Sequence, residues 1–432
     1  MGHLSLRNPY RRLRERLDMH PIGCPETQGI FELLKAIFTP EQAAFVCTLP
    51  MKFFPVREAC RRSGLSEKRA QKLLDELCDL GVVLDFERKG RRLYVVAPTL
   101  TGFLEFLFMR RRKNIDQPSL AVMMDRYLHQ NVGIIRDMIG DVRMGRALVH
   151  EEKVLPRDFV EVLDYEKASW VLSEAKAVAV GLCYCRHVAE HNGKACENEQ
   201  DVCMTLGTPA RALANHGIAR LVEKSEAQDI LARCKEAGLV QTADNVKNRP
   251  SYICHCCGCC CGQLVAVRHA RAAHPIQTSC FIAKIDEATC KGCGRCVRSC
   301  PVNALSLVAR VTHEKKKKYA AKVDGSFCLG CSVCVAACRN DALAMHRREQ
   351  KVIYPEDMLD KLVLQAVDTG KLQHLIFDNP ERWYGKAASR LVGSILGLEP
   401  SKRILASKQV RSAVLAGLMK GNATTQLLKK LF

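Results

Sequence analysis

Two cysteine-rich stretches decide the fold of the C-terminal third: "CKGCGRCVRSCPVNAL" at residues 290–305 and "CLGCSVCVAACRNDAL" at 328–343. They repeat each other, with identical residues at half of their positions. Each reads Cys-x2-Cys-x2-Cys-x3-Cys, and three thiols so closely spaced suit one loop wrapped around a metal centre. Gly292 and Gly330, one in each repeat, allow the backbone to make such a tight turn.

The repeats resemble the bacterial two-[4Fe-4S] ferredoxin module over residues 281–346, a βαβ-type pseudo-repeat in which each fourth cysteine reaches the other cluster. Pro301 follows Cys300 as in that pattern, whereas Arg339 replaces the second proline. The resemblance implies two [4Fe-4S] clusters. Their ligands would be Cys290, Cys293, Cys296 and Cys338 for the first cluster, and Cys328, Cys331, Cys334 and Cys300 for the second.

Composition limits the class of protein. A chain of 432 residues with 47% hydrophobic and 26% charged residues is globular, and its length predicts two to four domains. The N-terminus lacks the apolar core of a secretory signal, and no long apolar run predicts a membrane span, so we expect a cytoplasmic protein. In a reducing compartment, 24 cysteines point to metal ligands more than to disulfides.

The formal charge of +20 counts cluster thiolates as neutral. Each cubane with its four thiolates carries a net charge of about −2, so two clusters leave about +16 and four leave about +12. The chain stays basic, and an acidic redox partner, DNA or an anionic membrane surface would all suit it.

After a basic arm at 1–24, residues 25–115 predict a winged-helix-like domain. Helices are expected at 39–49, with a Thr39…Gln42 capping box, at 55–64, and at 66–81, before a hairpin turning at Lys89-Gly90. Cys47, Cys60 and Cys78 fall among apolar residues and are expected in the core. Basic residues that suit DNA are Lys68, Arg69, Lys72, Arg88, Lys89, Arg91 and Arg92. Four acidic residues share the 66–81 helix and oppose phosphate contact, so DNA binding is the weaker alternative.

Residues 116–280 predict an α/β middle domain rich in cysteine. "VAVGLCYCRHVAEHNGKACENEQDVC" places Cys183 and Cys185 after a strand-like run, with Cys196 and Cys203 following. Four thiols in so short a stretch could close a zinc site or cap a cluster. His187 and His191 are alternative ligands, although they also suit a helix with solvated histidines. Arg186 could offset thiolate charge, and a helix is expected at 225–238 with a Ser225…Gln228 capping box.

"ICHCCGCCCG" at 253–262 adds six more thiols. In an extended chain, Cys254, Cys256 and Cys260 would face one way and Cys257, Cys259 and Cys261 the other. Neither set closes a four-ligand site alone. Together with Cys183, Cys185, Cys196 and Cys203 they make ten tentative ligands, enough for one or two further clusters. A zinc ion, a thiol or persulfide-handling site and plain structural cysteines are the alternatives.

A wider resemblance covers residues 19–345. "MHPIGCPETQGIFELLKAIFTPEQA", the "CYCR…GKAC…C" pattern, "ICHCCGCCCG" and the two-cluster module occur in the same order in a family of multidomain iron–sulfur proteins of anaerobes. These are described as ferredoxin-type proteins. The resemblance implies that both middle motifs belong to one metal-bearing unit, and it supplies no substrate. Cys280 is not counted as a ligand.

Residues 347–432 predict a basic helical extension, either packed on the body or docked on an acidic partner or an anionic membrane surface. The sequence as a whole predicts an α+β multidomain protein. No P-loop or glycine-rich nucleotide fingerprint is present, so nucleotide cofactors are not indicated. We therefore expect an iron–sulfur electron-transfer protein or oxidoreductase subunit rather than a self-sufficient enzyme. A redox- or iron-sensing DNA-binding regulator and a thiol- or sulfur-handling enzyme are the alternatives.

Overall fold

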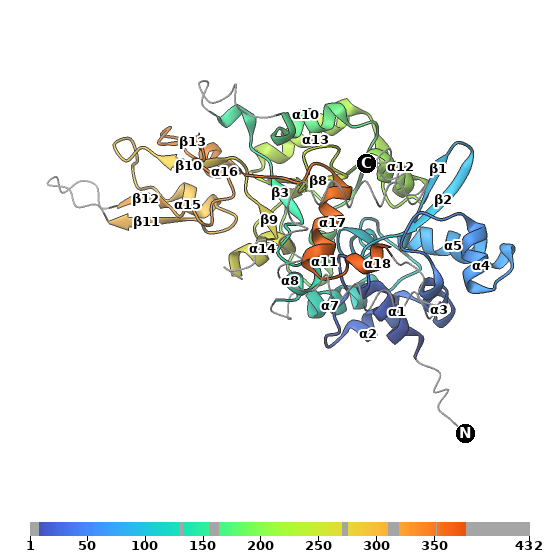
Figure 1. Ribbon diagram of the computed structural model, residues 1–432. Helices are drawn as coiled ribbons and strands as arrows, with labels where there is room; N and C mark the ends of the chain where they lie inside the picture. The colour runs from blue at the N-terminus through green and yellow to red at the C-terminus, as the bar shows by residue number, and fades with distance from the viewer. Residues whose placement is uncertain are drawn as a thin grey trace.

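The structure is a computed structural model, and Figure 1 shows its ribbon. It describes residues 8–128, 133–154, 164–269, 275–309, 319–350 and 352–376. The described residues form both helices and strands, as an α+β fold requires. The N-terminal helices and the four strands of the ferredoxin-like segment lie at opposite ends, and the middle sheet lies between them (Figure 1).

The N-terminal part is helical and ends in a hairpin. Its elements are α1 (Pro9–Asp18), α2 (Ile30–Ile37), α3 (Pro40–Thr48), α4 (Val56–Ser63), α5 (Glu67–Leu80), β1 (Val83–Arg88) and β2 (Arg91–Val96). Behind the hairpin follow η1 (Thr99–Phe103), α6 (Leu104–Phe106), α7 (Gln117–Leu128) and α8 (Ile134–Ile139). One hydrophobic core joins these helices and includes Leu13 and Leu17 of α1, so the described part of the expected basic arm is a packed helix.

Local signals explain where these elements begin and end. Thr39 and Gln42 form the expected capping box of α3, and Ser66 caps α5. Gly64 and Gly81 end their helices in the left-handed region. The expected capping box at Ser225 is wrong. Helix α13 begins one residue before it, and the Gln228 side chain instead donates to the Ser169 carbonyl, because tertiary contact outweighs the local cap.

The middle part contains a seven-stranded sheet in the order β6-β4-β5-β8-β7-β3-β9. All neighbours are antiparallel except β3 and β9. The strands are β3 (Gly145–Ala147), β4 (Val178–Leu182), β5 (Asp201–Leu206), β6 (Arg220–Val222), β7 (Val240–Asp244), β8 (Tyr252–Cys256) and β9 (Ile276–Gln277). The helical segments are η2 (Glu151–Lys153), η3 (Asp164–Glu166), α10 (Ala168–Glu174), α11 (Tyr184–His191), α12 (Gly207–Asn215), α13 (Lys224–Glu236) and α14 (Gly262–His269).

The cysteine repeats occupy two similar halves, β10 (Phe281–Ile285), α15 (Arg295–Ser299) and β11 (Leu305–Ala309), then β12 (Tyr319–Val323), α16 (Val333–Ala336) and β13 (Leu343–Arg347). The pairing crosses the halves, since β10 pairs with β13 and β11 with β12, both antiparallel. Each half is therefore a strand, a cysteine loop, a short helix and a strand, and neither half closes a sheet alone.

Helices α17 (Met358–Asp368) and α18 (Leu372–Ile376) return the chain to the middle of the molecule (Figure 1). Lys361 of α17 donates to the Met144 carbonyl at 2.6 Å and lies 3.4 Å from Asp244 at the end of β7, with both charged side chains 2% exposed. The expected basic tail from Tyr384 onward lies outside the described residues. In the described part of the chain, no helix has the length and apolarity to cross a membrane.

Candidate metal centres

The two cysteine loops fold tightly against neighbouring strands. Gly292 and Gly330 both adopt positive φ, at +64° and +75°. A Cβ at Gly292 would collide with the Tyr319 carbonyl oxygen, and one at Gly330 with that of Phe281. Glycine is required at both positions by conformation and by space, which explains why the two repeats share it.

Each loop surrounds a small cavity. One cavity is lined by Cys290, Cys293, Cys296 and Cys338, and the other by Cys300, Cys328, Cys331 and Cys334. These are the two quartets that the ferredoxin resemblance implies. The exchange of the fourth cysteine follows from the fold, because Cys300 and Cys338 stand just after α15 and α16 and so reach past their own loops.

In the second cavity, the Cys331 thiol is buried and a backbone amide lies close to the Cys300 sulfur. Burial raises the pKa of the Cys331 thiol to about 12, so without a metal this group stays protonated. The Ala304 amide lies 3.2 Å from Cys300 Sγ, and backbone amides aimed at sulfur stabilise a metal-bound thiolate. Arg339 stands at the position of the missing proline, and the preceding Cys338 still lines the first cavity with its quartet.

A third cavity lies on the middle sheet and is lined by seven cysteines. We call it the cysteine cavity. Its thiols come from the start of α11, from β5, and from β8 with the turn that follows; they are Cys183, Cys185, Cys203, Cys254, Cys256, Cys257 and Cys261. Hydrogen bonds from Cys254 and Cys261 lower the pKa of Cys256, which favours a thiolate at this position.

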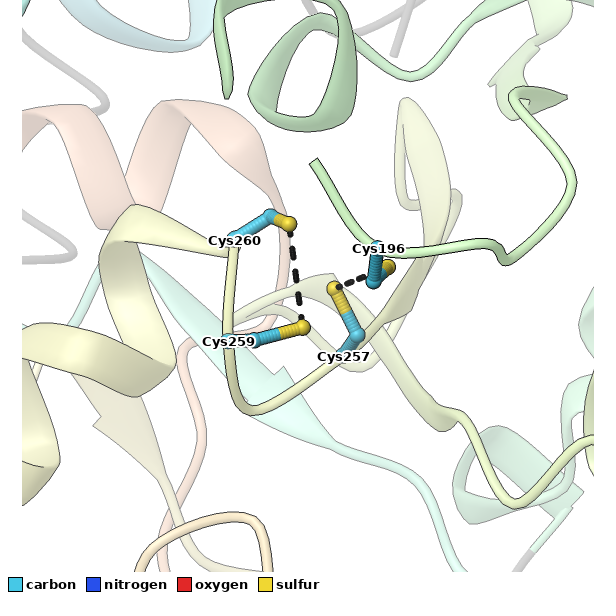
Figure 2. A group of neighbouring side chains, drawn as sticks. All are labelled: Cys196, Cys257, Cys259 and Cys260. Carbon is cyan, nitrogen blue, oxygen red and sulfur yellow. Dashed lines mark hydrogen bonds between the residues drawn. The ribbon is translucent and has the colours of Figure 1, made fainter. Parts of the chain in front are cut away.

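Four thiols form a compact group at the edge of this cavity. The sulfurs of Cys196, Cys257, Cys259 and Cys260 all lie within 4.8 Å of one another. Figure 2 shows Cys196 facing three cysteines of the turn after β8, with 3.8 Å between the sulfurs of Cys196 and Cys257 and 3.7 Å between those of Cys259 and Cys260. A tetrahedral zinc with Zn–S bonds of about 2.3 Å places its sulfurs about 3.8 Å apart. We call these residues the four-cysteine group.

The four-cysteine group is partly open to solvent, since Cys259 is exposed while Cys257 and Cys260 are buried. Burial raises the pKa of Cys196, but hydrogen bonds from Asn198 and from neighbouring thiols outweigh it and bring the value to about 6. The Asn198 amide nitrogen lies 3.3 Å from Cys196 Sγ. This group therefore has a thiolate ready for a metal at neutral pH.

The alternation expected along 254–261 is correct only in part. Cys254 and Cys256 do line one cavity, but Cys260 belongs to the four-cysteine group and Cys261 to the cysteine cavity. Strand geometry ends at Cys256, and the chain turns before α14 begins at Gly262, so the last two cysteines exchange sides. Sequence spacing alone carries no signal of this turn beyond Gly258.

Arg186 is a buried cation between the two sets of middle thiols. Its side chain is fully buried and donates to the carbonyls of Glu199 and His255, at 2.9 and 2.7 Å. Burial lowers its pKa, but the thiols of Cys183 and Cys257 more than compensate and raise it. A buried guanidinium is costly without anionic neighbours, so its presence fits the expected role of offsetting thiolate charge.

The two histidines expected as alternative ligands stand outside these groups. His187 is buried rather than solvated, and its Nδ1 lies 2.7 Å from the Phe108 carbonyl oxygen. The ring of His191 packs beside that of His187, with 4.8 Å between their centroids.

The three cysteines expected in the N-terminal core lie there. Cys47 and Cys78 are buried, and Cys60 packs against the same core. Cys78 also lies near Asp85 and His216, but both His216 nitrogens already contact carboxylates, those of Asp79 and Asp85.

The basic surface that would meet DNA under the DNA-binding alternative is partly neutralised within the chain. Arg69 of α5 pairs with Glu41, and Arg92 of the hairpin pairs with both Asp75 and Asp85. These two arginines are committed to intramolecular carboxylates, which reduces the positive field that a phosphate backbone would meet.

Comparison with known proteins identifies one part of the chain. Residues 289–342 match the family described as a 4Fe-4S dicluster domain. No curated protein and no solved structure matches the chain. The matched range contains all eight cysteines that line the two cavities, so this segment is an iron–sulfur domain of the ferredoxin type.

Proposed function

We propose that this protein is an iron–sulfur electron-transfer protein or oxidoreductase subunit that carries two [4Fe-4S] clusters and further metal in its middle part. The observation that carries the proposal is the arrangement of eight cysteines in two quartets, each lining its own cavity within the matched segment. The ligands proposed are Cys290, Cys293, Cys296 and Cys338 for one cluster, and Cys300, Cys328, Cys331 and Cys334 for the other.

In this proposal, the middle thiols divide between two kinds of centre. The spacing in the four-cysteine group suits a single tetrahedral ion such as zinc or iron. The thiols of a cubane bind different irons and stand further apart, and the larger ring of the cysteine cavity suits such a cluster. Cys257 lines the cavity and belongs to the group as well, so the two centres would be neighbours.

A continuous interior connects the ferredoxin segment with the cysteine cavity. Cys256 and Cys261 pack in the same hydrophobic cluster as the ferredoxin cysteines Cys296, Cys328 and Cys334. Because these cysteines share one buried cluster, electrons that pass between the two cubanes and the middle centre would not have to cross solvent. The domain division at 25–115, 116–280 and 281–346 is part of the same proposal, as is an external redox partner.

The proposal is tested by metal analysis of the full-length chain purified without oxygen. We expect at least about eight irons with matching sulfide, and a low-potential donor should reduce the protein. Cys293→Ser and Cys331→Ser, one in each quartet, should each lower the iron content by up to about four. Cys60→Ser, which removes a thiol outside both quartets, is the matched control. Full iron content in both quartet variants would overturn the ligand assignment.

A further inference from the structure

A larger cavity, about 270 Å³ in volume, lies where the N-terminal hairpin, the middle sheet and α17 meet. We call it the apolar cavity. Its walls are mostly hydrocarbon, with Phe86, Phe106 and Met109 on one side and Leu362 and Val363 of α17 on another. Its size is close to the lower end of the range for small-molecule sites, about 300–1,000 Å³.

The apolar cavity adjoins the cysteine cavity. Tyr184, Cys203, Cys254 and Gln263 line both of them. A molecule in the apolar cavity would therefore touch two of the thiols that the proposed function assigns to a middle centre. None of the other candidate ligands, including the four-cysteine group, borders this cavity.

One residue that lines this mostly apolar space carries a buried donor without a hydrogen-bond partner. Gln365 of α17 is 1% exposed, and its Nε2 has no partner among the described residues. Tyr252 and Gln263 also line the cavity, but the Tyr252 hydroxyl is engaged by the Gln263 side chain beside Gly145. A buried donor left unpaired costs roughly 1–3 kcal/mol, so such donors in a cavity point to a ligand that accepts from them.

We propose that the apolar cavity binds an uncharged, conjugated carbonyl compound of the quinone class in contact with the cysteine cavity. The hydrocarbon walls select a flat apolar ring, and the amide of Gln365 supplies a donor for a carbonyl oxygen. The conjugated class, rather than a plain hydrocarbon, rests on the proposed function, because a neighbouring electron-carrying centre suits a ligand that can take up electrons.

The test is equilibrium dialysis of the oxidised, metal-loaded full chain against 2,3-dimethyl-1,4-naphthoquinone, whose substituted ring does not add to thiols. The comparison ligand is 2,3-dimethylnaphthalene, which has the same ring without carbonyls. We expect saturable binding of about one quinone per chain. Val363→Trp fills the cavity and should lower quinone affinity at least tenfold, whereas Val122→Trp, at a position 49% exposed on α7, should leave it unchanged.

Gln365→Met keeps the shape of the side chain and removes its amide donor. It should lower quinone affinity roughly tenfold and leave hydrocarbon binding unchanged. Unsaturable uptake, or equal affinity in Val363→Trp and the native chain, would overturn the site, and an unchanged quinone affinity in Gln365→Met would overturn the hydrogen bond. Iron content is measured on the same samples, so failure of the proposed clusters is seen separately from failure of ligand binding.

Discussion

Gly258 lies in direct contact with Pro301. A Cβ at Gly258 would come within 2.9 Å of the Pro301 carbonyl oxygen and 3.0 Å of its Cα. Gly258 stands in the turn between Cys257 and Cys259, and Pro301 follows Cys300 of the ferredoxin segment. The two cysteine systems therefore touch through backbone, at a point where no side chain fits between them.

Gly258→Ala should impair electron transfer between the ferredoxin clusters and the middle centre. The added methyl group meets backbone, which gives way far less easily than a flexible side chain, so the turn must move away from Pro301. Rapid-freeze electron paramagnetic resonance after reduction should show slower filling of the middle centre with unchanged iron in the ferredoxin segment. Gly193→Ala is the control, because its φ of +68° strains the backbone while its added methyl group meets nothing within 4 Å. Equal rates in both variants would contradict this role of the contact.

Cys259→Ser should remove one metal ion and leave the cubanes intact. Cys259 is the exposed member of the four-cysteine group, so serine can replace it without disturbing the core. A hard hydroxyl is a poor substitute for a thiolate ligand, and metal affinity should fall strongly. Mass-spectrometric metal analysis should show about one equivalent of zinc or iron lost. Loss of about four irons would show instead that this group holds part of a cluster.

Glu105→Gln should change how stability depends on pH. Burial raises the pKa of Glu105 from 4.5 to about 7, despite hydrogen bonds from the amides of Thr101 and Gly102. The native state therefore holds a proton that the unfolded state releases, and the stability linked to it is lost as pH rises from 4.5 through 7.

Relative to the native chain, the Glu105→Gln variant should gain up to about 3 kcal/mol over this pH range. Thermal unfolding midpoints measured from acidic to mildly alkaline pH report the effect. Glu174→Gln, at an exposed position, controls for the loss of a carboxylate. Parallel pH profiles for the native chain and the Glu105→Gln variant would contradict the raised pKa.

Tyr354→Phe should destabilise the junction between the ferredoxin segment and the middle sheet. The Tyr354 hydroxyl lies 3.2 Å from Glu166 Oε1 and 3.0 Å from the Thr278 carbonyl oxygen, and the same Glu166 oxygen accepts from the Cys280 amide at 2.8 Å. Removing the hydroxyl leaves a fully buried carboxylate with one partner fewer, at a cost of about 1–3 kcal/mol in the free energy of unfolding. Urea unfolding measures it, with Tyr165→Phe as a control that keeps the neighbouring ring. An equal effect of both substitutions would show that the Tyr354 hydroxyl has no special role.

The repeat and its spacing predicted two tight cysteine loops, and the resemblance to the two-cluster module implied how their cysteines divide into two quartets. The capping box of Thr39 and Gln42 could also be predicted from sequence, because both residues belong to the first turn of the same helix. The four-cysteine group was not accessible, since Cys196 meets its partners only through the pairing of β5 with β8 and a turn at Gly258. The capping box predicted at Ser225 was wrong, because tertiary packing rather than local sequence sets the start of α13. The apolar cavity draws on three distant segments, so no local pattern marks it.

The exchange of fourth cysteines has a consequence for synthesis of the chain. Translated from the N-terminus, the quartet that begins with Cys300 is complete once Cys334 has been made. The quartet that begins with Cys290 must wait for Cys338, although three of its members were made first. The quartet that begins with Cys300 is therefore completed first during translation. A chain truncated between the repeats would hold three cysteines of one quartet and one of the other. Neither quartet can be completed before cysteines of the second repeat have been made.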